Sequence, residues 1–283
     1  MVQGQLTYNP AARFDVTTTE VIYKDDGDVA LPMTIFQPSG DGPFPALVRT
    51  HGGQWNLGSV DGAARIDQAL AECGMVVAAI EHRRAPDYPY PAQVQDTNAA
   101  IRWVKAHAAK YNVDPNCVGS AGDSSGAHTT LLTAMEPDNP LYLDGGDGDA
   151  SVAFVILLWG VLDPYTRYFY ALDVGREDIV EHTAAYFLTT EMMRQANPTM
   201  MAERREPMRK PPALIIQGDA DDNIPKSLPW MFVDAYESVG GDVQIEWFPG
   251  MPHRFGITHE KEGDRAIGLM RTFVAKQVGA TVR

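Results

Sequence analysis

A serine between two glycines is the first feature that could do chemistry. Residues 122–126 read Gly-Asp-Ser-Ser-Gly, with Ser124 at the centre. This pattern places a serine on a tight turn between a strand and a helix, where a Cβ at either glycine would crowd the backbone. A strand-like run at 117–121 precedes the turn and a helix-like run at 127–135 follows it, as the pattern requires. We predict that Ser124 is the nucleophile of an acyl-transfer reaction.

A glycine-rich stretch could supply the hydrogen-bond donors that such a reaction needs. Residues 51–55 read His-Gly-Gly-Gln-Trp and directly follow an apolar run of strand length. The tetrahedral intermediate of acyl transfer carries a negative oxygen, and each preorganised donor stabilises it by about 3 kcal/mol. We predict an oxyanion hole made by the backbone N–H groups of Gly53, Gln54 and Ser125. His51 is interpreted as a brace for this loop rather than as a proton carrier.

The base and its orienting acid are predicted from chain order. For a nucleophile on this kind of strand-to-helix turn, the catalytic residues follow along the chain in the order serine, acid, histidine. His253 lies in a Gly/Pro loop straight after the last predicted strand, whereas His182 and His259 do not. We therefore predict that His253 is the general base.

The acid is expected in the loop after the preceding strand. That loop offers three carboxylates as first candidates, those of Asp219, Asp221 and Asp222. Asp163 is the second candidate, because it follows another predicted strand. The acid would hold the tautomer of His253 and stabilise its imidazolium.

The elements that must position these residues alternate between strands and helices. Strand-like apolar runs and helix-period segments follow one another, which predicts a mostly parallel sheet covered on both faces. The predicted strands number eight: 21–23, 31–37, 46–50, 75–81, 117–121, 151–160, 213–218 and 244–248. The predicted helices are 61–73, 91–111, 125–135, 226–239 and 264–278. The first two strands are short and half polar, as expected of an antiparallel edge hairpin.

One segment interrupts this alternation. Residues 163–210 carry no strand signal and hold Met192, Met193, Met200, Met201 and Met208. We predict a small helical lid at 163–210, inserted into a core made of 1–162 and 211–283. The methionines would form an adaptable apolar pocket wall. The alternative is a helical layer that only stabilises the core.

Taken together, these motifs resemble a known family. The His-Gly-Gly loop at 51–55, the stretch 83–92 and the elbow at 122–126 are similar to those of hormone-sensitive-lipase-like bacterial carboxylesterases, a branch of the α/β-hydrolases. The likeness extends from Val21 to about 278. Gln54 stands where that branch usually has glycine, and Arg84 where it has an apolar residue. The loop with a bulky fourth residue is also similar to kynurenine formamidases and to small feruloyl and acetyl esterases.

The resemblance implies an α/β-hydrolase fold and hydrolysis of small to medium acyl esters through a Ser-His-Asp triad and an acyl-enzyme. The resembling families have a Gly-x-x-Asp-x-x-x-Pro pattern that falls on Gly218, Asp221 and Pro225. The resemblance therefore implies that Asp221 is the acid, with Asp219 and Asp222 as solvated loop residues.

Trp55, Met251 and Arg254 are predicted to bind substrate. For Trp55 the sequence leaves a second interpretation open, in which the ring only packs under the lid. Pairing of Arg254, or of an arginine in the cluster 204–210, with a substrate carboxylate is a minority hypothesis beside a solvated lid face. An amidase or formamidase on the same triad is the alternative activity. A ligand receptor on a hydrolase scaffold is a third hypothesis, and it would require a damaged triad.

Composition excludes several other classes. The chain has 283 residues and a formal net charge of −14, which repels phosphate backbones and anionic lipid and so predicts no nucleic-acid or membrane partner. The N-terminus has neither a cationic start nor an apolar core, so no secretory signal is predicted. Two cysteines form no disulfide framework and suit a cytoplasmic protein. No metal or cofactor motif is present, and the acidic stretch 144–149 lacks the glycine and glutamate of a calcium loop. The last predicted strand, 244–248, could pair with a second copy of the chain at the sheet edge, so a homodimer stays a hypothesis.

Overall fold

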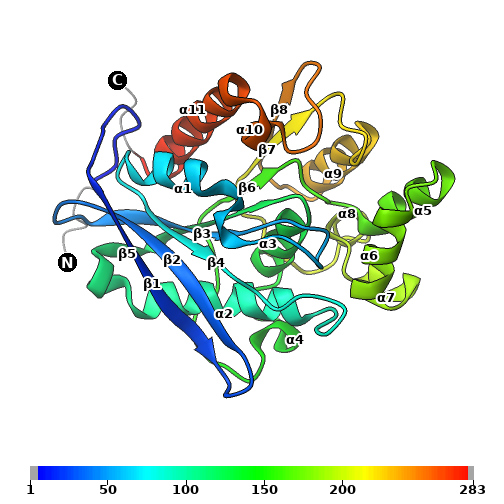
Figure 1. Cartoon of the computed structure of the whole chain (residues 1–283), viewed down its shortest axis with the longest axis horizontal. Coiled ribbons are helices and arrows are strands. Elements are labelled where there is room, and N and C mark those ends of the chain that lie inside the picture. The colour runs from blue at the N-terminus through cyan, green and yellow to red at the C-terminus, as the bar shows by residue number, and fades with distance from the viewer. Residues whose placement is uncertain (1–5, 280–283) are drawn as a thin grey trace.

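Eight strands form a single sheet in the computed structural model, which describes residues 6–279 (Figure 1). The order is β1-β2-β4-β3-β5-β6-β7-β8. The strands are β1 (Val16–Asp25), β2 (Ala30–Pro38), β3 (Phe44–Thr50), β4 (Val76–Ile80), β5 (Val113–Asp123), β6 (Val155–Leu158), β7 (Ala213–Gly218) and β8 (Val243–Phe248). The β1/β2 and β2/β4 pairs are antiparallel and the remaining pairs are parallel. The predicted eight-stranded, mostly parallel sheet is confirmed.

Helices cover both faces of this sheet. The helices are α1 (Ala64–Ala71), α2 (Ala92–Ala106), α3 (Ser125–Met135), α4 (Pro140–Leu143), α5 (Pro164–Asp173), α6 (Glu177–Phe187), α7 (Thr190–Gln195), α8 (Pro198–Glu203), α9 (Ser227–Ser238), α10 (Phe255–Thr258) and α11 (Glu260–Gln277). Short 3₁₀ turns at Val60–Ala63 and Ala108–Tyr111 complete them. In β6, Ile156 and Leu158 pack with α1 and α11, whereas Val155 and Leu157 pack with α3 and α9. Alternate side chains of this buried strand therefore pack against the helical layers on the two faces of the sheet.

The strand order contains a point where the chain reverses its direction across the sheet. From β3 the chain moves to β4 on one side, and it then returns to β5 on the other side of β3. Connections that diverge from neighbouring parallel strands leave a crevice beyond their carboxyl ends. The loops after β3, β5, β7 and β8 all emerge at this edge of the sheet, because those strands run parallel.

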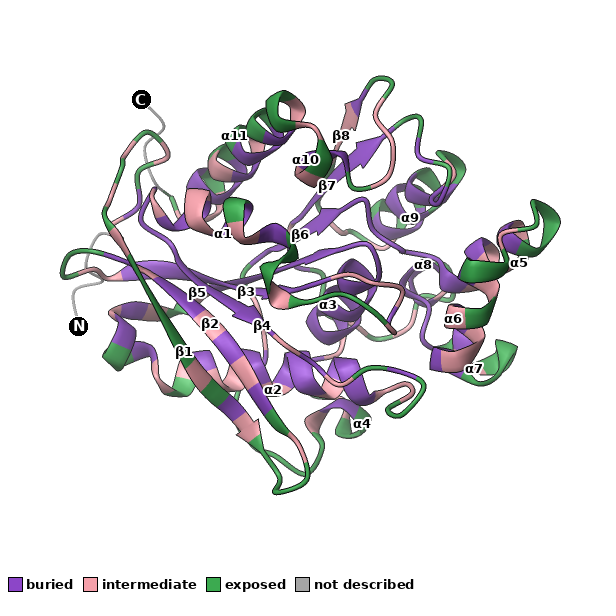
Figure 2. Cartoon of the chain, viewed as in Figure 1, coloured by how far each residue is buried: buried purple, intermediate pink, exposed green. Residues whose placement is uncertain are grey.

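The edge hairpin is longer than the sequence predicted. The expected strands 21–23 and 31–37 belong to strands of 10 and 9 residues. Figure 2 shows β1 largely exposed and the central strands buried. Because polar residues occupy the outer face of β1, its apolar signal is confined to a short stretch.

Another predicted strand is shorter in the structure. The apolar run 151–160 forms a strand only at Val155–Leu158. Trp159 adopts a left-handed backbone with φ 37° and leaves the strand there. A continuous apolar run marks burial and does not distinguish a strand from a buried loop, which explains the difference.

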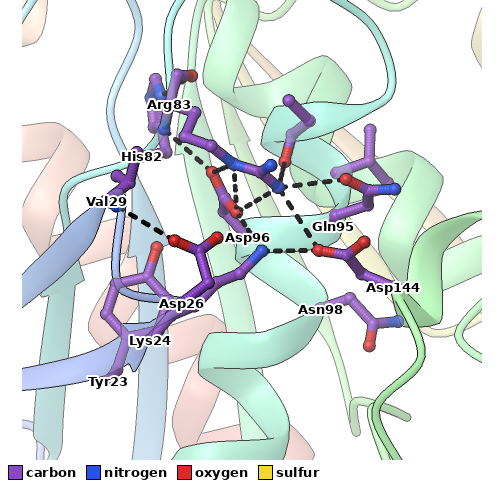
Figure 3. Close-up of polar contacts among 12 residues, drawn as sticks. Tyr23, Lys24, Asp26, Val29, His82, Arg83, Gln95, Asp96, Asn98 and Asp144 are labelled. Carbon is purple, nitrogen blue, oxygen red and sulfur yellow. Dashed lines mark hydrogen bonds and ion pairs between the residues drawn. The ribbon is translucent and has the colours of Figure 1, made fainter. Parts of the chain in front are cut away.

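A buried ion cluster ties the end of β1 to α2. Lys24 and Arg83 both contact the carboxylate of Asp96, whose side chain is completely buried (Figure 3). The Nζ of Lys24 lies 3.0 Å from Oδ1 of Asp96, and Nη2 of Arg83 lies 2.7 Å from the same oxygen. Asp144 contacts both cations from the opposite side. Two cations thus neutralise the carboxylate that would otherwise be costly to bury.

The helices between β6 and β7 form one group at the side of the molecule (Figure 1). Met193 and Met201 are buried in the core cluster that includes α3 and α9. None of the five methionines predicted as a pocket wall lines the pocket at Ser124, so that prediction is wrong. Met193 and Met201 instead fill the core beneath the helices, and Met192 and Met208 pack partly buried against it. No helix within residues 6–279 is long and apolar enough to cross a membrane.

Candidate active site

Ser124 lies on a sharp turn between β5 and α3. Its backbone has φ 53° and ψ −118°, a conformation that non-glycine residues rarely adopt. The Ser124 N–H donates to the carbonyl of Leu158 at 2.9 Å, and its own carbonyl accepts from the N–H of Val161 at 3.0 Å. A Cβ at Gly126 would collide with the backbone carbonyl of Thr50. The glycine therefore allows α3 to pack against the end of β3, and the strained turn is held from the neighbouring strand.

Ser124, His253 and Asp221 form a continuous hydrogen-bonded chain. The Nε2 of His253 lies 3.0 Å from the Oγ of Ser124. The Nδ1 of His253 lies 2.8 Å from Oδ2 of Asp221. The side chain of Asp221 is fully buried and that of His253 is 13% exposed. A hydroxyl, an imidazole and a carboxylate at these distances can pass a proton from the hydroxyl to the imidazole.

Asp221 is held by neutral donors on every side except that of the histidine. Its Oδ1 accepts from the backbone N–H groups of Asn223 at 2.9 Å and Ile224 at 2.8 Å. Its Oδ2 accepts from Nε2 of Gln217 at 2.8 Å as well as from His253. These bonds orient the carboxylate toward the imidazole.

The second candidate for the acid, Asp163, is occupied elsewhere. It caps α5 by accepting from the N–H and hydroxyl of Thr166, and it accepts from Asn197. It forms no hydrogen bond with His253, whose ring nitrogens contact Asp221 and Ser124. Neither His182 nor His259 is hydrogen-bonded to the serine. The structure therefore brings together the three residues chosen for the triad and none of the alternatives.

A buried arginine supports the loop that carries Asp221. The guanidinium of Arg167, on α5, donates to Oδ1 of Asn223 through Nε at 2.9 Å and through Nη2 at 2.5 Å. Burial lowers the pKa of Arg167 to about 10, although the nearby carboxylate of Asp221 acts in the opposite direction. The side chain remains charged at neutral pH and places a cation behind the acid loop.

Backbone N–H groups without an acceptor occur on the two loops that meet at the pocket of Ser124. Those of Gly53 and Gln54 find no acceptor in the described part of the chain. Ser125 is the first residue of α3, so its N–H has no partner within the helix. Gly53 has φ 133°, and a Cβ there would collide with the carbonyl of Leu57. The predicted donors thus lie on two loops with their hydrogen-bonding capacity unused.

Direct bonds tie these two loops together. The Trp55 N–H donates to Oγ of Ser125 at 3.1 Å. The Trp55 carbonyl accepts from Nε2 of Gln93 at 2.6 Å and from the N–H of Ala85 at 3.1 Å. The ring of Trp55 is fully buried and stacks on Tyr186 with centroids 5.1 Å apart. The prediction that Trp55 binds substrate is therefore wrong, because α6 covers its ring.

His51 braces the base of the loop, as predicted. Its ring stacks on that of His82 with centroids 4.1 Å apart, and its Nε2 lies 3.5 Å from Oε2 of Glu81. Burial alone would raise the pKa of Glu81, but the His51 ring and the N–H of Val60 lower it to about 2. Burial and the neighbouring His51 lower the pKa of His82 to about 3, so His82 is neutral at physiological pH.

Gln54 connects the same loop to α6. It has φ 54°, and its Oε1 lies 3.1 Å from Nδ1 of His182. Its Nε2 donates to Asp178 at 3.4 Å. The side chain of Asn56 donates to the carbonyls of both Gln54 and His182. Side chains from α6 thereby hold a loop whose left-handed backbone would suit glycine.

A pocket of about 280 Å³ adjoins Ser124. Its walls include Leu57, Ser59, Arg254 and Ile257 besides the serine. Met251 does not line this pocket. Its carbonyl accepts from the N–H of Ala220 and lies against Gly218, so its predicted role in substrate binding is wrong.

Several residues of the site were not identified from the sequence. Arg167 meets Asn223 across 56 positions, and His182 meets Gln54 across 128. Contacts of such separation have no local pattern. Asn223 could have been found, because an aspartate often accepts the N–H two residues ahead of it in a turn.

Comparison with known proteins places the chain in a family. A family model described as BD-FAE matches residues 33–234, more than half of the chain. The probable carboxylic ester hydrolase LipM of Mycobacterium tuberculosis is 29% identical over 83% of this chain and 55% of its own length. Esterase LipC of the same organism is 29% identical over 84% of this chain and 59% of its own. The chain thus spans little more than half the length of these curated relatives.

Solved structures match over nearly the full length. The native esterase Est2 of Thermogutta terrifontis superposes with a TM-score of 0.74 at 26% identity, covering 96% of each chain. The same esterase phosphorylated by paraoxon gives a TM-score of 0.75 at 25% identity, over 92% of this chain and 94% of that one. These matches confirm the resemblance noted in the sequence. The chain belongs to the BD-FAE family and has the α/β-hydrolase fold.

Proposed function

We propose that this protein is a serine carboxylic-ester hydrolase that acts through Ser124, His253 and Asp221. The observation that carries the proposal is the unbroken chain from Oγ of Ser124 to the carboxylate of Asp221, with links of 3.0 and 2.8 Å. The relatives LipM and LipC are described as an ester hydrolase and an esterase, which supports the same chemistry.

The first half of the reaction forms an acyl-enzyme. His253 takes the proton of Ser124 as Oγ attacks the ester carbonyl, and the carbonyl oxygen becomes an oxyanion. The N–H groups of Gly53, Gln54 and Ser125 hold that oxyanion. His253 then gives its proton to the leaving alkoxide, so the alcohol departs neutral and the acyl group stays on the serine.

The second half releases the acid. Water attacks the acyl-enzyme while His253 takes one of its protons, and the same donors hold the second oxyanion. Collapse of this intermediate returns the proton to Oγ of Ser124 and frees the carboxylic acid. Asp221 remains ionised throughout and holds the imidazole in position.

The pocket favours small to medium acyl esters. Its volume of about 280 Å³ lies at the lower end of the range of roughly 300–1,000 Å³ for small-molecule sites. Residues 163–210 act as a lid over a core made of 1–162 and 211–283, of which residues 1–5 and 280–283 lie outside the described structure. The bonds from α6 to Gln54 support this division.

Covalent labelling tests the nucleophile. Incubation with paraoxon is expected to label one residue per chain, and mass spectrometry of the digested protein should place the label on Ser124 rather than Ser125. Ser124→Ala should abolish the label and lower kcat on 4-nitrophenyl acetate by about 10⁴-fold or more. Ser59→Ala is the matched control, since Ser59 lines the pocket but contacts no triad residue, and its label should persist.

Two results would contradict the proposal. One is a Ser124→Ala protein that retains most of its esterase activity while folding normally. The other is a preference for an aryl formamide over the matched acetyl ester, which would favour the amidase alternative. An amide requires firm protonation of a poor amine leaving group, so turnover of both compounds distinguishes the two activities.

A further inference from the structure

Arg254 is a cation in the wall of the pocket beside Ser124. We propose that it selects esters that carry a carboxylate on the acyl or alcohol part and binds that carboxylate while the ester carbonyl lies at Ser124. This inference rests on the proposed esterase function and names the substrate class of the same site. A guanidinium is suited to the role, because its donors match the two oxygens of a carboxylate.

The first observation is that the charge of Arg254 is unused. Its side chain forms no ion pair and no hydrogen bond with any of residues 6–279. Most arginines of this chain do have such partners; Arg83 and Arg167, for example, are held by several acceptors. Among the described residues, the other arginines whose side chains have neither an ion pair nor a hydrogen bond are Arg194, Arg205 and Arg265, and none of these lines the pocket at Ser124.

The second observation is its place. Arg254 directly follows His253 and lines the pocket together with Ser124. It is the only arginine or lysine among the residues that line it. The acidic residue in the same wall, Asp123, is 7% exposed and lies near the buried guanidinium of Arg49. An exposed cation with free donors therefore lies in the wall of the space that a substrate would occupy, and the nearby carboxylate of Asp123 is already compensated.

The third observation is that another exposed arginine without a polar partner lies outside the pocket. Arg205, at the end of α8, is also exposed and also has no polar partner within the described residues. Its φ is 55° and that of Arg254 is 63°, so both arginines have left-handed backbones. Arg205 lies outside the pocket. Arg254 lines the pocket and Arg205 does not, so Arg205 is a matched control.

Matched ester pairs test the proposal. In one pair the charge lies on the alcohol side: 4-acetoxybenzoate and its neutral amide, 4-acetoxybenzamide. In the other it lies on the acyl side: mono-4-nitrophenyl glutarate and 4-nitrophenyl glutaramate. The measurement is kcat/KM for each compound after subtraction of the rate without enzyme, and its result is the ratio of anionic to neutral substrate within each pair.

The wild-type protein is expected to favour the anionic member of at least one pair. Arg254→Gln should lower that ratio about tenfold, mainly through KM, since it removes a charge-assisted hydrogen bond. Arg254→Lys should retain part of the preference, because it keeps the charge but loses the planar pair of donors. Arg205→Gln should leave both kcat/KM values and their ratio unchanged.

The outcomes are distinguishable. If the wild-type protein hydrolyses the neutral esters but shows no preference in either pair, the proposal for Arg254 is wrong and the esterase function stands. A ratio that is unchanged in Arg254→Gln contradicts the proposal equally. If no ester is hydrolysed and Ser124 takes no label from paraoxon, the esterase function itself has failed.

Discussion

Asp96 and Asp221 are two aspartates with fully buried side chains, and their partners differ in kind. Asp96 faces Lys24 and Arg83, whose positive charges are permanent at physiological pH. Asp221 faces backbone N–H groups, an amide and one imidazole, whose charge changes with a single proton. Around Asp96 the charges are already neutralised (Figure 3). Among the groups in direct contact with Asp221, a compensating charge appears only when His253 accepts a proton. The buried cation of Arg167 lies behind Asn223 and forms no bond with this carboxylate.

The groups in contact with a buried carboxylate separate a structural one from a functional one. Burial alone does not distinguish them, because both side chains are inaccessible to solvent. A carboxylate saturated by permanent cations stabilises the fold. A carboxylate that holds a titratable ring beside unused N–H donors can stabilise a charge that forms during a reaction.

The largest expected effect is at Asp221. Asp221→Asn should lower kcat on 4-nitrophenyl acetate by about 10⁴-fold, since an amide NH₂ can hold the imidazole in the wrong tautomer. The free energy of unfolding should change far less than it does for the matched change at Asp96. Steady-state kinetics together with urea unfolding measure both quantities. Activity within tenfold of the wild type would show that the two aspartates do not differ as argued.

Asp96→Asn is the reciprocal change. It removes the buried one of the two carboxylates that neutralise Lys24 and Arg83 and leaves only the partly exposed Asp144, so we expect a loss of about 3 kcal/mol in the free energy of unfolding. The kcat of the folded protein should stay within about twofold, because no residue of this cluster contacts the triad. A fall in kcat comparable to that of Asp221→Asn would break the comparison.

Acid should destabilise the protein through histidines that stay neutral when folded. Burial lowers the pKa of His82 to about 3 and that of His128 to about 4, whereas in the unfolded chain both are near 6.5. The unfolded state therefore binds more protons below pH 6.5, and stability falls as the pH falls toward 4. Between pH 7.5 and pH 5 we expect a loss of about 2 kcal/mol for each histidine.

Urea unfolding at the two pH values measures this loss. His128→Gln should reduce the difference in unfolding free energy between pH 7.5 and pH 5 by about 2 kcal/mol. His259→Gln is the control, because His259 is only half-buried. An equal pH dependence in all three proteins would contradict the expectation.

The smallest effect is expected at Arg167, which acts on Asp221 through Asn223. Arg167→Lys keeps the charge but loses the paired bonds to Asn223, and kcat should fall about tenfold with KM little changed. Arg167→Met also removes the buried charge behind Asp221, so the acidic limb of its pH–rate profile should move to higher pH. An unshifted limb in Arg167→Met would assign this arginine a purely structural role.

The sequence predicted those parts of the fold and site that have a local pattern. The eight strands and the helix at 125–135 follow from periodicity and turn residues. Ser124, His253 and Asp221 follow from motif and chain order, and the structure brings them within hydrogen-bond distance; their catalytic roles stay predictions.

What the sequence could not predict depends on which groups meet in space. Trp55 is of a residue type that often lines pockets. Its ring is covered by Tyr186 and Phe187, which lie on a helix more than a hundred residues further along the chain. Met251 and the methionines of 163–210 were predicted to line the pocket because of their residue type. In the structure none of them lines the pocket at Ser124, and Met193 and Met201 are buried in the core. The support of the acid loop by Arg167 likewise required knowledge of a contact between distant segments.

The bonds from α6 to Gln54 and Asn56 make one mechanical unit of two parts that are separate in the chain. The helix cannot swing away without breaking the contacts that keep Gln54 in its uncommon backbone conformation. Access to the serine from that side and the alignment of the amide at position 54 must therefore change together.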